Sequence, residues 1–190
     1  MSPEVQTYIS PEEYLAFERK AANRNEYVNG EIFAMTGTSR TRNLIVGNIT
    51  AELWRQLREQ STEVYAFKMR VKPLAAGAYI YPDVVVVCGE PRLEDDYFDT
   101  LLNPTLVVEV LSKSTESYNR LAKSSYYRTI ESLSEYLLVS QEEYRVEQYI
   151  KQAEGRWLLA DVRLLAGVIE LESIGCSLAL RDMYERITFD

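Results

Sequence analysis

Two short apolar runs, each with one carboxylate, constrain the fold of this chain most. Residues 84–87 are four consecutive valines directly preceded by Asp83, and residues 105–111 form a second apolar run that contains Glu109. Near-continuous β-branched runs of this length are typical of strands that are buried on both faces. The chain must therefore fold around a covered sheet, and the two buried carboxylates need partners or a metal ion because burying an uncompensated charge is costly.

The remaining pattern alternates helices and strands. Ser10-Pro11-Glu12-Glu13 predicts a helix start with a capping box, and the helix should extend to about residue 22. Asn29-Gly30 predicts the turn of a β-hairpin. We expect further helices at residues 41–60, after Ser114 and at 183–187, and strands at 63–71, 79–88, 105–111, 135–139, 146–150, 157–161 and 167–171.

This order predicts an α/β (α+β) fold: a central mixed sheet flanked by helices, with an N-terminal helix-hairpin and a C-terminal antiparallel extension. A length of 190 residues predicts one domain, over residues 1–190. The chain contains no histidine, which excludes Ser-His-Asp triads, Cys-His dyads and histidine zinc sites. Cys88 and Cys176 are too few for a disulfide scaffold, and we expect both to be reduced, buried thiols.

Net charge and hydropathy limit the classes of binding partner and the cellular location that we expect. The formal net charge is −8, so binding to DNA or RNA would need a local basic patch and divalent ions. No apolar run is long enough to span a membrane and no signal peptide is visible, so a cytoplasmic location is the expectation. Residues 90–99 carry five acidic side chains and one arginine, and we interpret them as a solvated loop.

Asp83 and Glu109 could form one site. If their strands are neighbours, strand alternation brings both carboxylates to the same place, and two carboxylates with water suit Mg²⁺ or Mn²⁺. Lys123, on the helix that follows the Glu109 strand, could orient a metal-bound water or stabilise negative charge that develops in the reaction. A turn at Pro82-Asp83 and a simple Glu109–lysine ion pair are the structural alternatives.

Other charged residues could support this site. Glu31 is our candidate accessory acid, with Glu26 behind it, although both could be exposed hairpin carboxylates. Residues 112–130 have four basic side chains and one acidic side chain, which makes them the most basic stretch of the chain. That stretch includes Lys113, at the exit of the strand that contains Glu109. Arg42 lies near the N-terminus of the helix expected at residues 41–60, a position that favours the binding of anions.

The ordered set of these motifs resembles the Uma-two family of restriction-endonuclease-like proteins, over about residues 8–187. The resemblance is carried by Tyr8–Leu15, Glu26–Glu31, Asn43–Ile45, Lys68–Val71, Tyr81–Val84, Val108–Ser112, Ser114-Thr115, Lys123 and Glu135-Tyr136.

The resemblance implies a PD-(D/E)xK nuclease fold in which Asp83 and Glu109 are the motif acids and bind the metal. The usual lysine would fall at Leu111, and family members look as if it has moved to the following helix, at Lys123. Two positions depart from the family pattern: a common histidine is Arg42 here, and a common aspartate is Asn119. Both replacements remove groups that could accept a proton or help to bind a metal.

Three functions therefore stay open. The first is a Mg²⁺- or Mn²⁺-dependent endonuclease that acts on DNA. The second is a catalytically impaired binding or assembly protein in which Lys123 only pairs with Glu109. The third is a phosphoesterase that acts on small phosphate esters. The 14 tyrosines and the apolar strands also suggest a homodimer.

Overall fold

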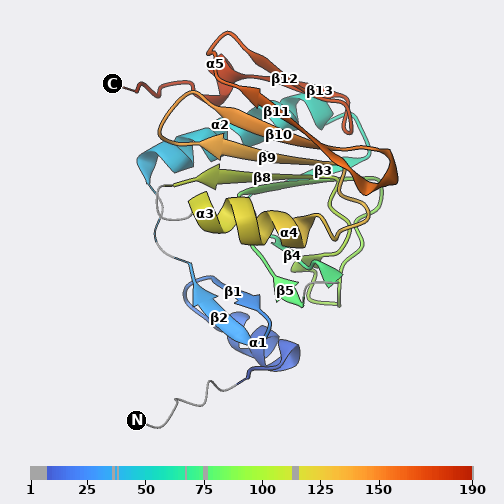
Figure 1. Ribbon diagram of the computed structural model, residues 1–190. Helices are drawn as coiled ribbons and strands as arrows, with labels where there is room; N and C mark the ends of the chain where they lie inside the picture. The colour runs from blue at the N-terminus through green and yellow to red at the C-terminus, as the bar shows by residue number, and fades with distance from the viewer. Residues whose placement is uncertain are drawn as a thin grey trace.

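A six-stranded mixed sheet forms the centre of the molecule (Figure 1). The computed structural model describes residues 8–35, 37, 39–66, 68–74, 77–112 and 116–189. The strand order is β11-β10-β9-β8-β6-β3; β8 and β9 are parallel, and the other neighbours are antiparallel. The strands are β3 (Thr62–Ala66), β6 (Val84–Cys88), β8 (Leu106–Leu111), β9 (Glu135–Ser140), β10 (Val146–Lys151) and β11 (Trp157–Val162).

The two apolar runs of the sequence are central strands and are neighbours, so the condition for bringing Asp83 and Glu109 together is met. Val84 of β6 lies opposite Val108 of β8, and the four valines of β6 are at most 1% exposed. Val84 and Val86 pack into the core on one face of the sheet, whereas Val85 and Val87 pack into the core on the other. The sheet is therefore covered on both faces, which confirms the expected mixed α/β architecture.

Helices and a C-terminal hairpin provide this cover (Figure 1). The core on one face contains buried residues of α2 together with residues of the C-terminal β-hairpin and the short helix that follows it. The other face is covered by a helical segment that contains a π-helical turn. These elements are α2 (Arg40–Leu57), α3 (Glu116–Tyr118), the π-helical turn Asn119–Lys123, α4 (Ser124–Tyr127), β12 (Val168–Leu171), β13 (Cys176–Ala179) and α5 (Leu180–Met183).

The N-terminal helix and hairpin form a smaller layer with a sheet of order β2-β1-β5. The capping box is present: Ser10 Oγ accepts the Glu13 N–H at 3.2 Å, and Glu13 Oε2 accepts the Ser10 N–H at 2.8 Å. Asn29 and Gly30 both have positive φ, the conformation that a two-residue hairpin turn needs. The remaining elements are α1 (Pro11–Glu18), β1 (Asn25–Val28), β2 (Glu31–Ala34), β4 (Arg70–Val71), β5 (Ala78–Tyr79) and β7 (Thr100–Leu101).

Several local expectations were wrong. The predicted strands at 63–71 and 79–88 are each broken into two, and the last helix lies at Leu180–Met183 rather than at 183–187. Cys88 is exposed, whereas Cys176 is buried as expected. Among the residues that the structure describes, no helix has the length and apolarity that a bilayer crossing requires.

The acidic segment 90–99 is also not simply solvated. Asp99 pairs with Arg19 at 3.1 Å and with the buried Arg70 at 2.5 Å, and Glu94 forms an ion pair with Lys72. The segment therefore ties the N-terminal helix to the small sheet that contains β4. Sequence could not show this because the arginines lie far from the segment along the chain.

The pair between Asp99 and Arg70 predicts a pH-dependent contribution to stability. Burial alone would raise the pKa of Asp99, but Arg19 and Arg70 outweigh it and lower the pKa to about 2. Because the folded-state pKa is below the usual value, the stabilisation is present above about pH 4 and is lost as pH falls towards 2. We expect Asp99→Asn to lower the free energy of unfolding by roughly 2 kcal/mol at pH 7, because Arg70 loses its carboxylate.

Urea unfolding of both proteins between pH 7 and pH 3 measures this effect, and the difference should shrink at the acidic end. Asp96→Asn, an exposed position in the same segment, is the control and should leave stability unchanged. If the difference in the free energy of unfolding between the wild type and Asp99→Asn does not change with pH, the ion pair between Asp99 and Arg70 is not its source.

Candidate active site

Asp83 is anchored on both chain neighbours of Glu109. The Asp83 N–H donates to the Val108 carbonyl oxygen at 3.1 Å, and Asp83 Oδ2 accepts the Val110 N–H at 2.7 Å. Asp83 precedes β6 directly, whereas Glu109 lies inside β8, and they are 5% and 0% exposed. The antiparallel pairing of the two strands therefore brings the two carboxylates into one buried cluster.

Lys123 and Tyr127 reach Glu109 from the helix above the sheet. Lys123 Nζ lies 3.1 Å from Glu109 Oε1, and the Tyr127 hydroxyl donates to the same oxygen at 2.7 Å. Within the described part of the chain, Glu109 Oε2 is buried and has no hydrogen-bond partner. A buried carboxylate oxygen without a donor needs an explanation, and a bound cation is one. Tyr127 was not among the residues predicted for the site, although its position four residues after Lys123 indicates that both side chains lie on one helix face.

The hairpin contributes Glu26 rather than Glu31 to this cluster. Glu26 Oε1 lies 2.7 Å from Lys123 Nζ and accepts the Tyr81 N–H at 3.1 Å. Glu31 is exposed at the start of β2, opposite Val28. Strand β1 is buried along its whole length: Tyr27 packs against Tyr14 of α1 and Tyr79 of β5, and Val28 packs into the core on the side of α4. Little in the sequence indicated this burial.

Arg42 binds the carboxylate of Asp83. Its Nε and Nη2 atoms donate to Asp83 Oδ1 and Oδ2 at 2.9 and 3.0 Å, a bidentate pair that is largely shielded from solvent. Arg42 lies in the first turn of α2, where its N–H donates to Ser39 Oγ at 3.0 Å. The sequence drew attention to Arg42 as the replacement of a family histidine, but only the structure shows it bound to Asp83.

The cluster contains three carboxylates and two cations, so one negative charge is in excess. Burial raises the pKa of Asp83 to about 6; Glu109 adds to the rise, and Arg42 and the Val110 N–H oppose it. Burial also raises the pKa of Glu26, against the opposing effect of Lys123. Burial acts to lower the pKa of Lys123, but Glu109 and Glu26 outweigh it and raise the pKa, so this lysine is protonated at neutral pH.

These residues fit a hard divalent cation. In the described residues no three acidic or cysteine side chains converge closely enough to form a complete metal site. However, Mg²⁺ is commonly bound through one or two carboxylates, with water and substrate phosphate as its other ligands. Asp83 and Glu109 supply two such carboxylates, and the excess negative charge of the cluster favours the binding of a cation. Glu109 Oε2, which has no hydrogen-bond partner among the described residues, is available as a ligand atom.

The other predicted residues lie apart from these contacts. Asn119 is 2% exposed in the π-helical turn, and its carbonyl oxygen accepts a hydrogen bond from the Tyr136 hydroxyl at 3.4 Å. Lys113 lies outside the described residues.

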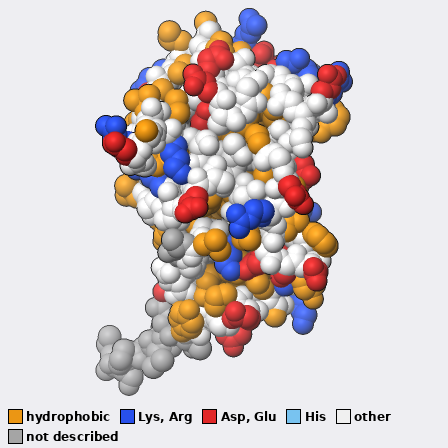
Figure 2. All heavy atoms as spheres, turned by 90° about the vertical axis from the view of Figure 1, so that its right-hand side faces the viewer, with side chains coloured by type: hydrophobic (Ala, Val, Ile, Leu, Met, Phe, Trp, Pro, Cys, Tyr) orange, Lys and Arg blue, Asp and Glu red, His pale blue; other side chains and the backbone are white. Residues whose placement is uncertain are grey.

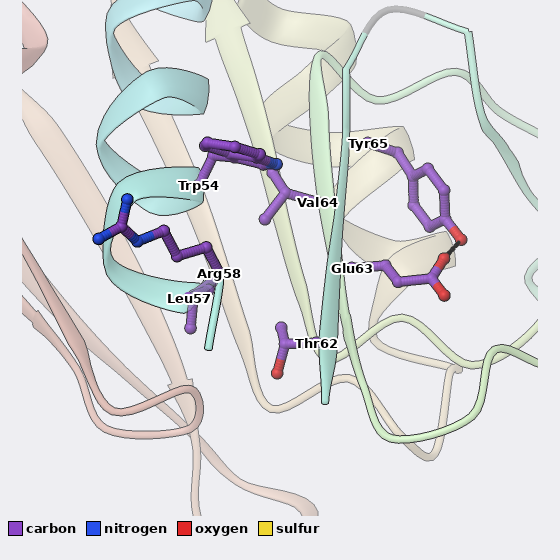
Figure 3. A pocket seen from close by; sticks show the side chains of 7 residues that line it. All are labelled: Trp54, Leu57, Arg58, Thr62, Glu63, Val64 and Tyr65. Atoms are coloured by element: carbon purple, nitrogen blue, oxygen red, sulfur yellow. Dashed lines mark hydrogen bonds between the residues drawn. The ribbon is translucent and has the colours of Figure 1, made fainter. Parts of the chain in front are cut away.

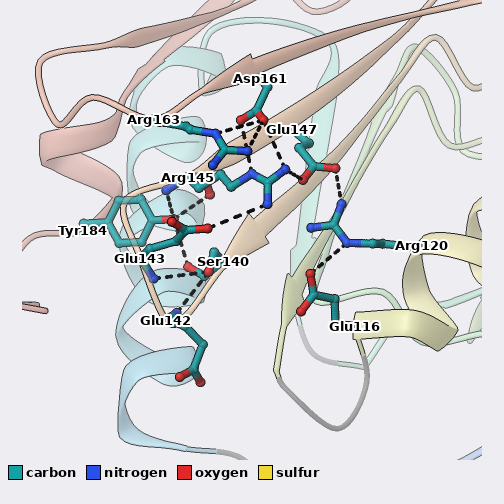
Figure 4. A network of polar contacts seen from close by, with 10 residues as sticks. All are labelled: Glu116, Arg120, Ser140, Glu142, Glu143, Arg145, Glu147, Asp161, Arg163 and Tyr184. Carbon is teal, nitrogen blue, oxygen red and sulfur yellow. Dashed lines mark hydrogen bonds and ion pairs between the residues drawn. The ribbon is translucent and has the colours of Figure 1, made fainter.

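Two basic side chains of the stretch 112–130 are paired with carboxylates: Lys123 with Glu26 and Glu109, and Arg120 in the network of Figure 4. Arg120 pairs with Glu116 at 2.9 Å and also with the buried Glu147. Glu147 in turn pairs with Arg145 at 2.5 Å, so the network continues across the sheet to β11. A pocket of about 290 Å³ lies beside this network; it is lined by Leu111, Ser112, Glu116, Arg120, Ser140, Glu142, Glu143 and Arg145.

Comparison with known proteins places this geometry in context. Residues 11–181 match the model of the Uma2 family, described as "Putative restriction endonuclease". Two uncharacterized proteins of Synechocystis sp. are similar: sll1609 is 35% identical over 81% of this chain and 87% of its own length, and slr1290 is 34% identical over 95% and 94%. The crystal structure of a putative nuclease of the DUF820 group from Anabaena variabilis has a TM-score of 0.72 at 15% identity, covering 93% of this chain and 97% of that one, which shows the shared fold.

Proposed function

Since the chain belongs to the Uma2 family of restriction-endonuclease-like proteins, we propose that it is a Mg²⁺- or Mn²⁺-dependent endonuclease that hydrolyses DNA phosphodiester bonds. One observation carries the proposal: Asp83 and Glu109 come together in a buried cluster with Lys123, and Glu109 keeps an oxygen without a partner. Paired carboxylates beside a lysine are a suitable arrangement for metal-assisted phosphate chemistry.

Each residue has a defined role in this proposal. Asp83 and Glu109 would hold the cation, which when bound lowers the pKa of a water molecule and neutralises charge on the phosphate. Lys123 stays protonated and provides a fixed positive charge beside Glu109, which would stabilise negative charge that develops on the phosphate. Glu26 orients Lys123 through an ion pair of 2.7 Å and so takes the accessory part that was predicted for Glu31.

DNA would have to bind without a broad basic surface. On the face shown in Figure 2, Lys and Arg side chains stand next to Asp and Glu rather than in one continuous basic area. The net charge of −8 also repels a polyanion at long range. Binding should therefore depend strongly on the divalent ion and weaken with salt. We also propose that the protein is a homodimer.

A second candidate function has a specific observation in its favour. Arg42 occupies both oxygens of Asp83, and Lys123 pairs with Glu109, so both motif acids already have cationic partners. A protein of the nuclease fold that serves in binding or assembly could keep such ion pairs with no need for Mg²⁺ or Mn²⁺. Metal uptake separates the two functions.

The test is calorimetric titration of Mn²⁺ into the wild type and into Asp83→Asn, together with a plasmid-nicking assay. We expect saturable binding and nicking by the wild type and the loss of both in the variant. Asp182→Asn, a half-exposed carboxylate at α5, is the control and should behave as wild type. Metal binding without nicking would indicate a damaged or specialised site, with Arg42 and Asn119 as the first suspects. A wild type that binds no metal would overturn the endonuclease proposal and favour the second candidate.

A further inference from the structure

The last strand of the central sheet has an open edge. In the described part of the chain, β11 pairs only with β10. The Gln152 N–H donates to the Arg156 carbonyl oxygen at 2.7 Å, which sets the alternation of the antiparallel ladder. With the register Tyr149–Leu159, the residues hydrogen-bonded to β10 are 158, 160 and 162. The N–H and C=O groups of Trp157, Leu159 and Asp161 therefore point away from β10, to the open side.

This edge is also apolar on both of its faces. Leu158 and Leu159 are adjacent, so they lie on opposite faces of the sheet, yet they are 54% and 51% exposed. The turn that follows adds Leu164, at 74%, and Leu165, at 41%. An exposed apolar edge strand is a template for another strand, and proteins normally cover or charge such an edge.

The opposite edge of the sheet is better protected. On β3 the Thr62 N–H already donates to the Gln60 carbonyl oxygen, and the exposed Glu63 places a charge on the strand. Figure 3 shows the side chain of Trp54, from α2, beside Val64. A pocket of about 340 Å³ lies there, lined by Trp54, Leu57, Arg58, Thr62, Glu63, Val64 and Tyr65. Edge pairing is therefore favoured at β11 over β3.

We propose that the homodimer forms through β11, which pairs antiparallel with the same strand of a second copy. The two-fold axis would pass beside Leu159, so that Leu159 faces the partner's Leu159 and Trp157 faces the partner's Asp161. This register uses the outward backbone groups of residues 157, 159 and 161 in both copies and joins the two central sheets into one. The inference rests on the proposed homodimer and is independent of the nuclease chemistry.

Charge and size agree with a second copy as the occupant. Residues 154–163 contain Glu154, Arg156, Asp161 and Arg163, so the segment is neutral in a chain of net charge −8 and can approach itself without repulsion. Asp161 is further neutralised by Arg145 at 3.1 Å and Arg163 at 2.9 Å. A stable dimer buries roughly 800 Å² per partner, more than one short strand provides, and the exposed leucines of the following turn extend the apolar surface.

The test is sedimentation of the full chain without DNA or metal, over a range of protein concentrations. The wild type should sediment at twice the monomer mass. Leu159→Lys places two ammonium groups opposite each other and should raise the dimer dissociation constant by about tenfold or more. Leu74→Lys, which changes a leucine that is 64% exposed and lies outside β11 and the turn after it, should stay dimeric. Far-UV circular dichroism of each variant verifies folding.

Cross-linking tests the register itself. Leu159→Cys, made with Cys88→Ser to remove the exposed native thiol, should form a covalent dimer on oxidation because paired residues in such a ladder are about 5.5 Å apart. A wild type that stays monomeric overturns both the homodimer and this interface but leaves the nuclease proposal intact. A dimer that Leu159→Lys does not weaken, or that Leu159→Cys does not cross-link, overturns the interface alone.

Discussion

Replacing Glu109 with glutamine is expected to reduce metal-dependent DNA cleavage by about a thousandfold or more, an effect in the range seen when a catalytic charge-stabilising group is lost. The change keeps the size of the side chain but removes the charge that would hold the cation together with Asp83. It also removes the charge partner of Lys123 at 3.1 Å, so this lysine would keep only Glu26. Plasmid nicking under single-turnover conditions, with Mn²⁺ titration in parallel, measures the effect.

Glu135→Gln is the matched control for this variant. Glu135 is also a glutamate on a central strand and is 1% exposed, but its partners are Gln148 and Ser173, away from the candidate site. If both variants lose cleavage equally, the loss reflects folding rather than chemistry. Undiminished cleavage by Glu109→Gln would remove Glu109 from the site.

Replacing Arg42 with alanine is expected to tighten Mn²⁺ binding by about tenfold or more. The guanidinium donates to both oxygens of Asp83, so a cation must compete with it for the same carboxylate. Without metal the variant should be less stable than the wild type, because Asp83 is left buried without its arginine. Added Mn²⁺ should then raise its melting temperature more than that of the wild type, since a ligand that binds only the folded state stabilises it.

The measurements should be made well above pH 7, because the carboxyl of Asp83 must be ionised to bind a cation. The pKa of Asp83 is about 6 in the wild type, and it rises further in the variant because Arg42 no longer lowers it. Arg40→Ala, an exposed arginine two residues earlier in the same helix, should leave metal affinity unchanged. Weaker Mn²⁺ binding by Arg42→Ala would mean that this arginine supports the metal site rather than competing with it.

The predictions from the sequence agree best with the structure where the residues of a single helix, strand or turn form a recognisable local pattern. The valine run of β6 and the apolar run of β8 have the pattern typical of covered strands. The capping box at Ser10 and the turn at Asn29-Gly30 formed where their local chemistry favours them. The sequence left open whether the strands of Asp83 and Glu109 are neighbours, because each buried carboxylate could have had its own separate partner; the pairing of β6 with β8 decides it.

Residues whose roles depend on distant partners were not predictable. Arg42 and Asp83 are 41 residues apart, and Glu26 and Lys123 are 97 apart, yet each pair is in direct contact. The acidic segment was misinterpreted for the same reason, since the arginines that neutralise it are Arg19, directly after α1, and Arg70 of β4.

The sequence by itself therefore determined which strands are buried and which two acids lie on them, because burial of apolar side chains follows from local pattern and alternation. Only the tertiary structure decided which cations meet those acids: Arg42 on Asp83, Lys123 on Glu109, and Glu26 rather than Glu31 on Lys123. Ion pairs act over a few ångströms in space, and the packing of helices on the sheet, not the spacing of residues along the chain, sets those distances.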